Sequence, residues 1–138
     1  MDRLSPEKRS WLMSRVTSKN TRPELTVRVL LHRLGYRFRL HGQRLRGKPD
    51  IVFSKRKKVI FVHGCFWHGH VGCRLGRLPQ SNLDFWAPKI ERTRARDQEA
   101  ISALEADGWQ TLVIWQCELK DLDALSNRLV FFLGAPRA

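Results

Sequence analysis

The chain has 138 residues, which suits one domain with its own hydrophobic core and is too short for two. No stretch approaches the ~20 apolar residues that cross a bilayer, the charged N-terminus has no signal-peptide core, and three cysteines make no disulfide framework, so a cytoplasmic protein without membrane segments is expected. The net charge is +13, and residues 1–48 hold 13 basic and 3 acidic side chains, which favours nucleic-acid phosphate as a partner over a solubilising face or an anionic membrane.

Residues 1–20 are predicted to be a basic arm. Ser5 and Pro6 have the residue types of a helix cap and a first helical position, and the helix fades over residues 17–20. Few apolar side chains occur in this segment, so we expect an arm that orders on its ligand. Residues 21–138 form the predicted folded domain.

The first half of this domain is predicted to be a helix followed by three strands. Thr21 and Glu24 match a capping box, which by itself explains Glu24, and an apolar stripe at helical spacing runs to Gly35. A half-buried strand over residues 36–40 leads into a basic loop, and the strands 51–53 and 58–62 follow.

The second half is predicted to contain a loop, a long helix, a strand and a last helix. The two helices have alternative caps, which are Asn82 or Asp84 for the first and Asp121 or Asp123 for the second. Gly108 ends the long helix, and residues 111–115 form a buried strand. This order predicts one mixed sheet with helices on its faces, an α/β domain.

The loop over residues 64–73 has the most unusual composition, with two thiols, two imidazoles and two adjacent large aromatics. Three of its residues have the soft ligand atoms and the short spacing that tetrahedral zinc favours: Cys65, His70 and Cys73. Cys117, the remaining cysteine of the sequence, would close a four-ligand site and pin a late segment onto this loop. His68 stays outside this metal set.

Two carboxylates each have a structural and a functional interpretation. Asp50 follows Pro49 at the start of a strand, where it suits either a turn or a Mg²⁺-binding carboxylate for phosphodiester cleavage. Asp97 falls on the apolar stripe of the long helix, where an unpaired carboxylate is costly. It could pair with an arginine, but His63 and His68 both need an orienting carboxylate, and we favour that partnership.

The aromatic residues of the loop also have two interpretations. Phe66 and Trp67 could cover the core, or they could enter a base stack, where aromatic wedges unstack DNA at ~a few kcal/mol per step. Trp86, in the first turn of the long helix, could join them. Because the cysteines constrain the loop, we do not expect both loop aromatics to be buried.

Motifs spread over nearly the whole chain match one known family. They are MSRV at 13–16 with KNTRPEL at 19–25, GKPD at 47–50, VIFVHGCFWH at 59–68, FW at 85–86 with KI at 89–90, RD at 96–97, and GW at 108–109 with WQCEL at 115–119. In this combination the chain resembles the very short patch repair (Vsr) endonucleases, bacterial enzymes that nick DNA beside a T:G mismatch.

The resemblance implies a fold related to type II restriction endonucleases, of the PD-(D/E)xK class, with a zinc-stapled loop. Residues 21–138 would be the endonuclease domain and residues 1–20 a DNA-gripping arm. Structural zinc would be held by Cys65, His70, Cys73 and Cys117. The implied substrate is duplex DNA with a T:G mismatch left by deaminated 5-methylcytosine. Mismatch-repair proteins and a DNA polymerase are implied as partners of a monomeric, nucleoid-associated enzyme.

The resemblance also implies residue roles for Mg²⁺-dependent hydrolysis. Asp50 would bind the catalytic Mg²⁺, His68 would activate or orient the attacking water, and His63 with Asp97 would complete that network. Glu24 would reach the metals through water. The DNA-contacting set would be the wedge aromatics and three residues of the arm: Phe66, Trp67, Trp86, Met13, Arg15 and Lys19.

Three features depart from the expected pattern. Restriction-type sites usually carry Glu-x-Lys where residues 62–64 here read Val-His-Gly, so His68 would replace the lysine. Val62 stands where threonine is expected, and it would bind Mg²⁺ through its backbone carbonyl. The loop around His70 is one residue longer than expected. The rival hypotheses are a nuclease of the same fold with other specificity and a catalytically silent, zinc-stabilised DNA-binding module, although the latter has no use for Asp97.

Overall fold

The computed structural model describes residues 21–136 of the chain. Within them, four strands form a single sheet in the order β1-β2-β3-β4. Their bounds are β1 (Arg39–Leu40), β2 (Ile51–Phe53), β3 (Lys58–His63) and β4 (Gln110–Trp115). β1 pairs antiparallel with β2 and β2 with β3, whereas β3 and β4 run parallel. The predicted mixed sheet of an α/β domain is therefore confirmed.

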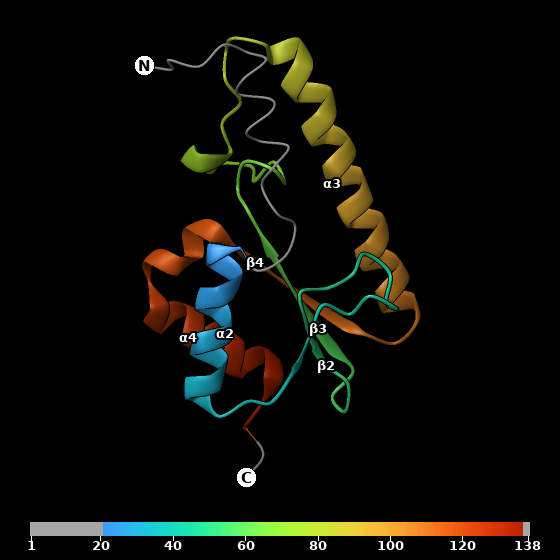
Figure 1. Cartoon of the computed structure of the whole chain (residues 1–138), viewed down its shortest axis with the longest axis vertical. Helices are drawn as coiled ribbons and strands as arrows, with labels where there is room; N and C mark the ends of the chain where they lie inside the picture. Colours follow the sequence, from blue (N-terminus) through green and yellow to red (C-terminus); the bar gives the residue numbers. More distant parts are fainter. Residues whose placement is uncertain (1–20, 137–138) are drawn as a thin grey trace.

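Helices complete the element order that was predicted for the described residues. They are α2 (Arg22–Leu34), α3 (Leu83–Ala106) and α4 (Leu122–Leu133), with two short 3-10 helices, η1 (Arg74–Gly76) and η2 (Gln116–Lys120). Figure 1 shows α2 and α4 together on one side of the sheet and α3 on the other. No helix in this part of the chain is both long and apolar enough to cross a membrane. The predicted arm, residues 1–20 with Met13, Arg15 and Lys19, lies outside the described residues.

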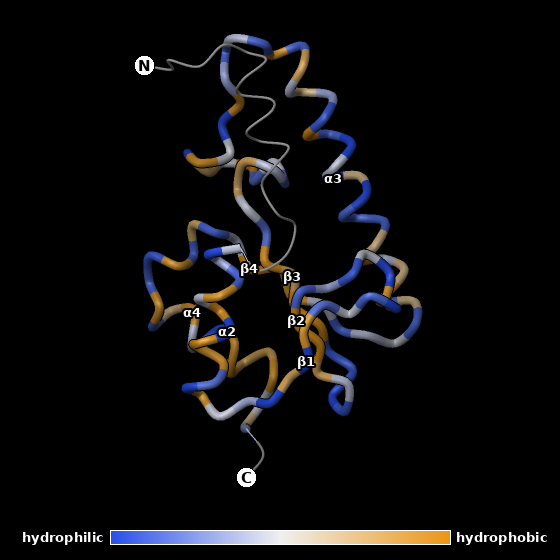
Figure 2. Tube along the Cα trace, viewed as in Figure 1, coloured by the Kyte–Doolittle hydropathy of each residue, from blue (hydrophilic) through white to orange (hydrophobic). Residues whose placement is uncertain are grey.

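The two faces of the sheet bury different side chains because successive strand residues point to opposite faces. The larger core lies against α2 and α4 and takes from the sheet Ile51, Phe53, Ile60 and Ile114. The smaller core lies against Leu104 of α3 and takes from the sheet Val52, Val59 and Phe61. Figure 2 shows the strongly hydrophobic segments gathered where the strands meet α2 and α4. The α3 face of the sheet therefore carries the smaller core and also borders a cavity that polar side chains line.

Residues 36–40 form less strand than predicted. Only Arg39 and Leu40 pair with β2. Tyr36 is instead 2% exposed, and its hydroxyl donates to the carbonyl of Gly134 just after α4. This contact turns the segment toward the helical layer, so tertiary packing overrides the local strand preference.

The predicted limits of α2 are confirmed, but its predicted capping box is wrong. Thr21 is the N-cap and Gly35, with φ of 93°, follows the last residue. The Thr21 side chain makes no capping hydrogen bond, and Glu24 points into the protein with 1% of its surface exposed. Pro23 in the first turn fixes φ for the helix start instead.

The structure shows which of the predicted N-cap residues begin α3 and α4. Asn82 is the N-cap of α3, although its side chain makes no capping hydrogen bond. Asp121 caps α4, because its Oδ1 accepts a hydrogen bond from the backbone N–H of Ala124 at 3.1 Å. Gly108, with φ of 90°, follows α3 as predicted.

Candidate active site

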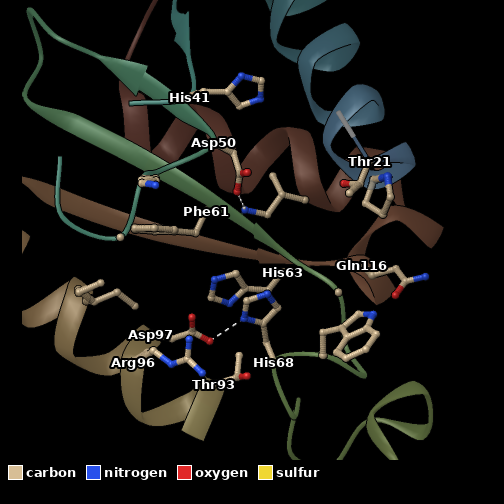
Figure 3. A pocket seen from close by; sticks show the side chains of 18 of the residues that line it. Thr21, His41, Asp50, Phe61, His63, His68, Thr93, Arg96, Asp97 and Gln116 are labelled. Carbon is tan, nitrogen blue, oxygen red and sulfur yellow. Dashed lines mark hydrogen bonds and ion pairs between the residues drawn. The ribbon is translucent and has the colours of Figure 1, made fainter. Parts of the chain in front are cut away.

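Strand alternation places two polar side chains on the α3 side of the sheet, at the end where β2 starts and β3 stops. Asp50 immediately precedes β2 and has the parity of Val52, and His63 ends β3 with the parity of Phe61. Both line a cavity of about 820 Å³ between the sheet, α3 and the loop after β3. Figure 3 shows His63 and His68 side by side, a dashed line that joins His68 to Asp97, and Asp50 farther along the sheet.

Asp50 is held by the neighbouring strand. Its Oδ2 accepts a hydrogen bond from the backbone N–H of Val62 at 2.7 Å. Burial raises the pKa of Asp50 to about 6, the hydrogen bond from Val62 opposes that rise, and the Glu24 carboxylate adds to it. The side chain is therefore mostly ionised at neutral pH while it is poorly solvated, which favours a cation beside it.

His68 and Asp97 form a close pair. Asp97 lies on the second half of α3 and places Oδ2 2.6 Å from Nδ1 of His68. A carboxylate only accepts, so Nδ1 carries a proton, and in the neutral form of the imidazole Nε2 keeps its lone pair. Of the two partners considered for Asp97, the structure provides the imidazole, and Asp97 faces the cavity half-buried instead of lying in the core.

His63 is stacked on His68. The ring centroids lie 3.8 Å apart with 3° between the planes, and His63 Nδ1 is a buried atom without a hydrogen-bond partner among the described residues. Burial lowers the pKa of His63 to about 4, the neighbouring His68 lowers it further whenever that imidazole is protonated, and Asp97 opposes the shift. His63 is therefore neutral at pH 7, and it fixes the plane of the His68 ring.

Glu24 does not line the cavity among the described residues, but it reaches the cavity through His41, a residue that sequence analysis left without a role. Glu24 Oε1 lies 2.8 Å from His41 Nε2 and 2.5 Å from an Arg28 nitrogen. His41 lines the cavity, has φ of 51°, and its backbone N–H donates to the carbonyl of Asp50 at 2.9 Å. The position of His41, nine residues before Asp50 and at the edge of a basic loop, could have identified it as a site residue from the sequence.

The wall of the cavity formed by α3 contributes residues that were not predicted. They lie three or four positions apart on one helix face: Lys89, Thr93, Arg96 and Ala100. The same spacing places Asp97 beside them. Periodicity could have found this stripe, but its polar members do not differ in type from an ordinary solvated helix face.

The four predicted zinc ligands are brought together. The ligand atoms of Cys65, His70, Cys73 and Cys117 all lie within 4.8 Å of one another. The backbone N–H of Cys117 donates to Cys65 Sγ at 3.4 Å, and Cys117 Sγ lies 3.5 Å from His70 Nδ1. Cys117 belongs to η2, directly after β4, so the cluster joins the loop after β3 to the end of the neighbouring parallel strand.

The chemistry of this cluster suits a soft or borderline divalent cation. Tetrahedral zinc with ligands at about 2.3 Å separates its sulfur atoms by about 3.8 Å, which is compatible with the observed grouping. Burial raises the pKa of the Cys65 thiol to about 12. Burial also tends to raise the pKa of Cys73, but hydrogen bonds from His70, Leu75 and the other thiols lower it to about 6. A cation bound by all four atoms would favour the thiolate of each cysteine.

A positive φ and a close helix contact shape the loop beside the cluster. Gly69 has φ of 60°, and a Cβ at this position would lie 2.6 Å from Ile90 and 2.7 Å from Arg94 of α3. Only glycine meets both conditions without displacing the Ile90 and Arg94 side chains. The residue before Gly69, His68, lines the cavity, and the residue after it, His70, belongs to the Cys/His cluster.

The predicted wedge aromatics form one cluster with different exposures. Phe66 and Trp67 are half-buried, and their rings stack edge-to-face on each other and on Trp86. Trp86 is 2% exposed, so it supports the other two rings and does not present a free face. Phe85, which was not singled out as a contact residue, is 46% exposed beside it. Lys89 places its ammonium 5.5 Å from the ring centroid of Trp67.

Comparison with known proteins places this geometry in a family. A sequence model described as DNA mismatch endonuclease Vsr matches residues 1–74, which include Asp50, His68 and three of the clustered ligands. The chain belongs to the Vsr family. It is 37% identical over 119 residues to the DNA mismatch endonuclease Vsr of Escherichia coli (strain K12), covering 86% of this chain and 76% of that protein.

Other Vsr-like proteins are also similar along most of their length. The type II nicking enzyme V.XorIIP of Xanthomonas oryzae pv. oryzae is 66% identical over 128 residues, 93% of each chain. The type II nicking enzyme V.NmeAIP of Neisseria meningitidis is 45% identical over 128 residues, 93% of this chain and 91% of that one. The protein is therefore a Vsr-family DNA endonuclease, a hydrolase that acts on DNA.

Proposed function

We propose that this protein nicks duplex DNA beside the mispaired T of a T:G mismatch, by metal-dependent hydrolysis of one phosphodiester bond. The observation that carries the proposal is the opening of Asp50 and the His68–Asp97 pair into one cavity. This arrangement combines a carboxylate suited to a metal with an imidazole suited to a proton, as the resemblance to the Vsr endonucleases implied.

His68 is proposed to take the proton of the attacking water. Its Nε2 is the nitrogen left with a lone pair, because Asp97 engages Nδ1. Asp97 then stabilises the imidazolium that forms, and the stacked, neutral His63 keeps the ring in one plane. Glu24 is proposed to act from outside the cavity, through His41.

Asp50 is proposed to hold a divalent cation, Mg²⁺, with the backbone carbonyl of Val62 as a second oxygen ligand. Carboxylate and carbonyl oxygens are the ligands that Mg²⁺ prefers. The pKa of Asp50, raised to about 6 by burial, supports this assignment, since a cation would offset the cost of the buried charge. When bound, such an ion supplies Lewis-acid stabilisation of the developing phosphate charge.

The fold is proposed to be that of the restriction endonucleases, stapled by structural zinc. The mixed sheet with Asp50 at a strand start supports the fold assignment. Two sulfur donors from the loop after β3, one from η2 and one imidazole support zinc. Four protein ligands leave no open position, so the ion is assigned to structure and not to catalysis.

DNA contacts are proposed for the aromatic cluster and for the arm. Phe66 and Trp67, which are half-buried, would enter the base stack beside the mismatch, with Trp86 supporting them from beneath. Met13, Arg15 and Lys19 are proposed to grip the duplex. Mismatch-repair proteins and a DNA polymerase stay predictions for the steps that follow the nick.

A nicking assay tests the proposed function. End-labelled duplexes that differ only at one pair, T:G, C:G or T:A, are incubated with the protein and Mg²⁺, with Asp50→Ala as the inactive control. A single nick beside the mispaired T, absent with Asp50→Ala, is the expected result. Cleavage of all three duplexes would show a nuclease of other specificity, and tight T:G binding without cleavage would show a silent binding module.

A further inference from the structure

A second cavity lies on the other side of the loop after β3 from the catalytic cavity. It has a volume of about 590 Å³ and runs between residues 69–78 and α3. Three arginines line it, Arg74, Arg77 and Arg94, against one carboxylate, Glu91. We name this cavity the arginine groove.

The arginines of this groove are available to a ligand. All three are exposed, and Arg94 pairs with Glu91 only at 3.5 Å, with the two side chains 45% and 72% exposed. Such an exposed pair contributes little and is easily exchanged for a stronger anion. Gly72, at the tip of the loop, has φ of 77° and no atom within 4 Å of a Cβ placed there, so its backbone is open to close approach.

The groove and the catalytic cavity use different faces of α3. The catalytic cavity takes Lys89, Thr93 and Asp97, whereas the groove takes Ile90 and Arg94 with their neighbours. At 3.6 residues per turn the centres of these two faces are roughly 100° apart around the helix. The loop separates them, because Trp67 and His68 line the first cavity and residues 69–78 line the second.

We propose that the arginine groove binds the phosphate backbone of the duplex arm that continues past the loop aromatics. This inference rests on the proposed function. If Phe66 and Trp67 part a base step, the duplex lies on both sides of the loop. One arm then occupies the catalytic cavity, and the other arm passes over the groove. Arginines suit phosphate because the guanidinium is always charged and can donate two parallel hydrogen bonds.

The test removes charge at the groove and, in a matched control, elsewhere. The groove variant is Arg74→Gln/Arg77→Gln/Arg94→Gln. The control variant is Arg37→Gln/Arg39→Gln/Lys55→Gln, which removes the same charge from exposed residues near β1 and the β2–β3 turn. Circular dichroism and bound-metal content establish that both variants are folded. Binding to T:G and fully matched 30-base-pair duplexes is then measured without Mg²⁺ at several salt concentrations.

The groove variant is expected to bind both duplexes about 10- to 100-fold more weakly near physiological salt, and to lose about 2 to 3 from the slope of log affinity against log salt. The control variant should change the slope by less than about 1. Shortening the duplex arm that passes over the groove should weaken DNA binding by the parent but not by the groove variant. At saturating T:G duplex with Mg²⁺, the groove variant should keep the nicking rate of the parent and show only a raised KM.

Equal salt slopes for the groove and control variants would overturn the proposal. Loss of binding to a polyglutamate peptide, with an unchanged DNA slope, would also overturn it and assign the groove to an acidic polypeptide. A reduced slope in a protein that shows no T:G preference would uphold the groove and refute the proposed specificity. The two proposals therefore fail separately.

Discussion

Burial acts on Asp50 and His63 in opposite senses at the same end of the sheet. It raises the pKa of the carboxyl to about 6 and lowers the pKa of the imidazole to about 4, because the charged form of each is poorly solvated. At pH 7 the carboxylate keeps its charge at a cost to folding, while the imidazole stays neutral. The buried charge of Asp50 lies at the position where a cation is proposed to bind, and a bound cation would offset its unfavourable free energy.

Asp50→Asn is expected to abolish nicking and to stabilise the fold without Mg²⁺. The folded-state pKa of about 6 lies above the ordinary value of 3.8, so the native state binds more protons between them and stability falls as pH rises through that window. Asparagine has no charge to bury, so it removes this loss of stability. The free energy of unfolding of the variant should exceed that of the parent by about 3 kcal/mol at pH 7.5 and by roughly half of that at pH 5, measured by urea unfolding. A variant less stable than the parent at pH 7.5 would contradict this account.

His68→Ala is expected to slow nicking by about 10²–10⁴-fold, because it removes the proposed base. Asp97→Asn keeps the shape of the partner but not its charge, and a loss of at least about tenfold is expected. Single-turnover nicking and T:G duplex affinity are measured together, and affinity should change little. His32→Ala, an exposed histidine outside the cavity, is the control. Unchanged turnover for His68→Ala would remove the residue from the mechanism.

At the scale of elements, the Cys/His cluster couples two parallel strands beyond their hydrogen bonds. β3 and β4 pair along six residues each, and the cluster then joins the loop after β3 to η2 after β4. The loop carries His68 and the aromatic residues on its way to His70. The cluster therefore fixes where His68 and the loop aromatics, the proposed catalytic and DNA-contacting side chains, lie relative to the sheet.

Zinc removal, or Cys117→Ser, is expected to destabilise the fold and abolish nicking together. With zinc at about 1,000 times its dissociation constant, binding contributes about 4 kcal/mol to stability, and this contribution disappears without the ion. Metal content is measured by atomic emission and stability by thermal melting in Mg²⁺-free buffer. Restored zinc should rescue the chelated parent but not the variant. A metal-free chain that still melts cooperatively at the parent Tm would refute a structural role.

At the scale of the whole molecule, one chain supplies the complete candidate site. Asp50 from the sheet, His68 from the loop and Asp97 from α3 line one cavity without a second subunit. One such site within residues 21–136 suits the proposed cleavage of a single strand.

The protein is therefore expected to act as a monomer on DNA. Analytical ultracentrifugation with a labelled T:G duplex should show a 1:1 complex at micromolar concentration, and the product should be a nick without a double-strand break. The matched duplex at the same concentration provides the reference for nonspecific binding. A 2:1 complex, or cleavage of both strands at one mismatch, would contradict this expectation.

The sequence by itself determined the element order, the C-terminal ends of α2 and α3, and the ligand types. Gly35 and Gly108 end helices through a backbone conformation that glycine adopts most easily, and this preference is local. The Cys/His cluster was predicted as a metal site because thiols and an imidazole are rare at such spacing. Asp97 was found because a carboxylate on an apolar stripe must have a partner.

Only the tertiary structure decided which partners met. Glu24 contacts His41 and does not form the predicted capping box. Trp86 is buried beneath Phe66 and Trp67. Both side chains contact elements that are distant in the sequence. Tyr36 was predicted to lie in a strand, but its hydroxyl donates a hydrogen bond to the carbonyl of Gly134, far along the chain. Local propensities amount to about 1 kcal/mol or less per residue, so a buried contact between distant segments can reverse them.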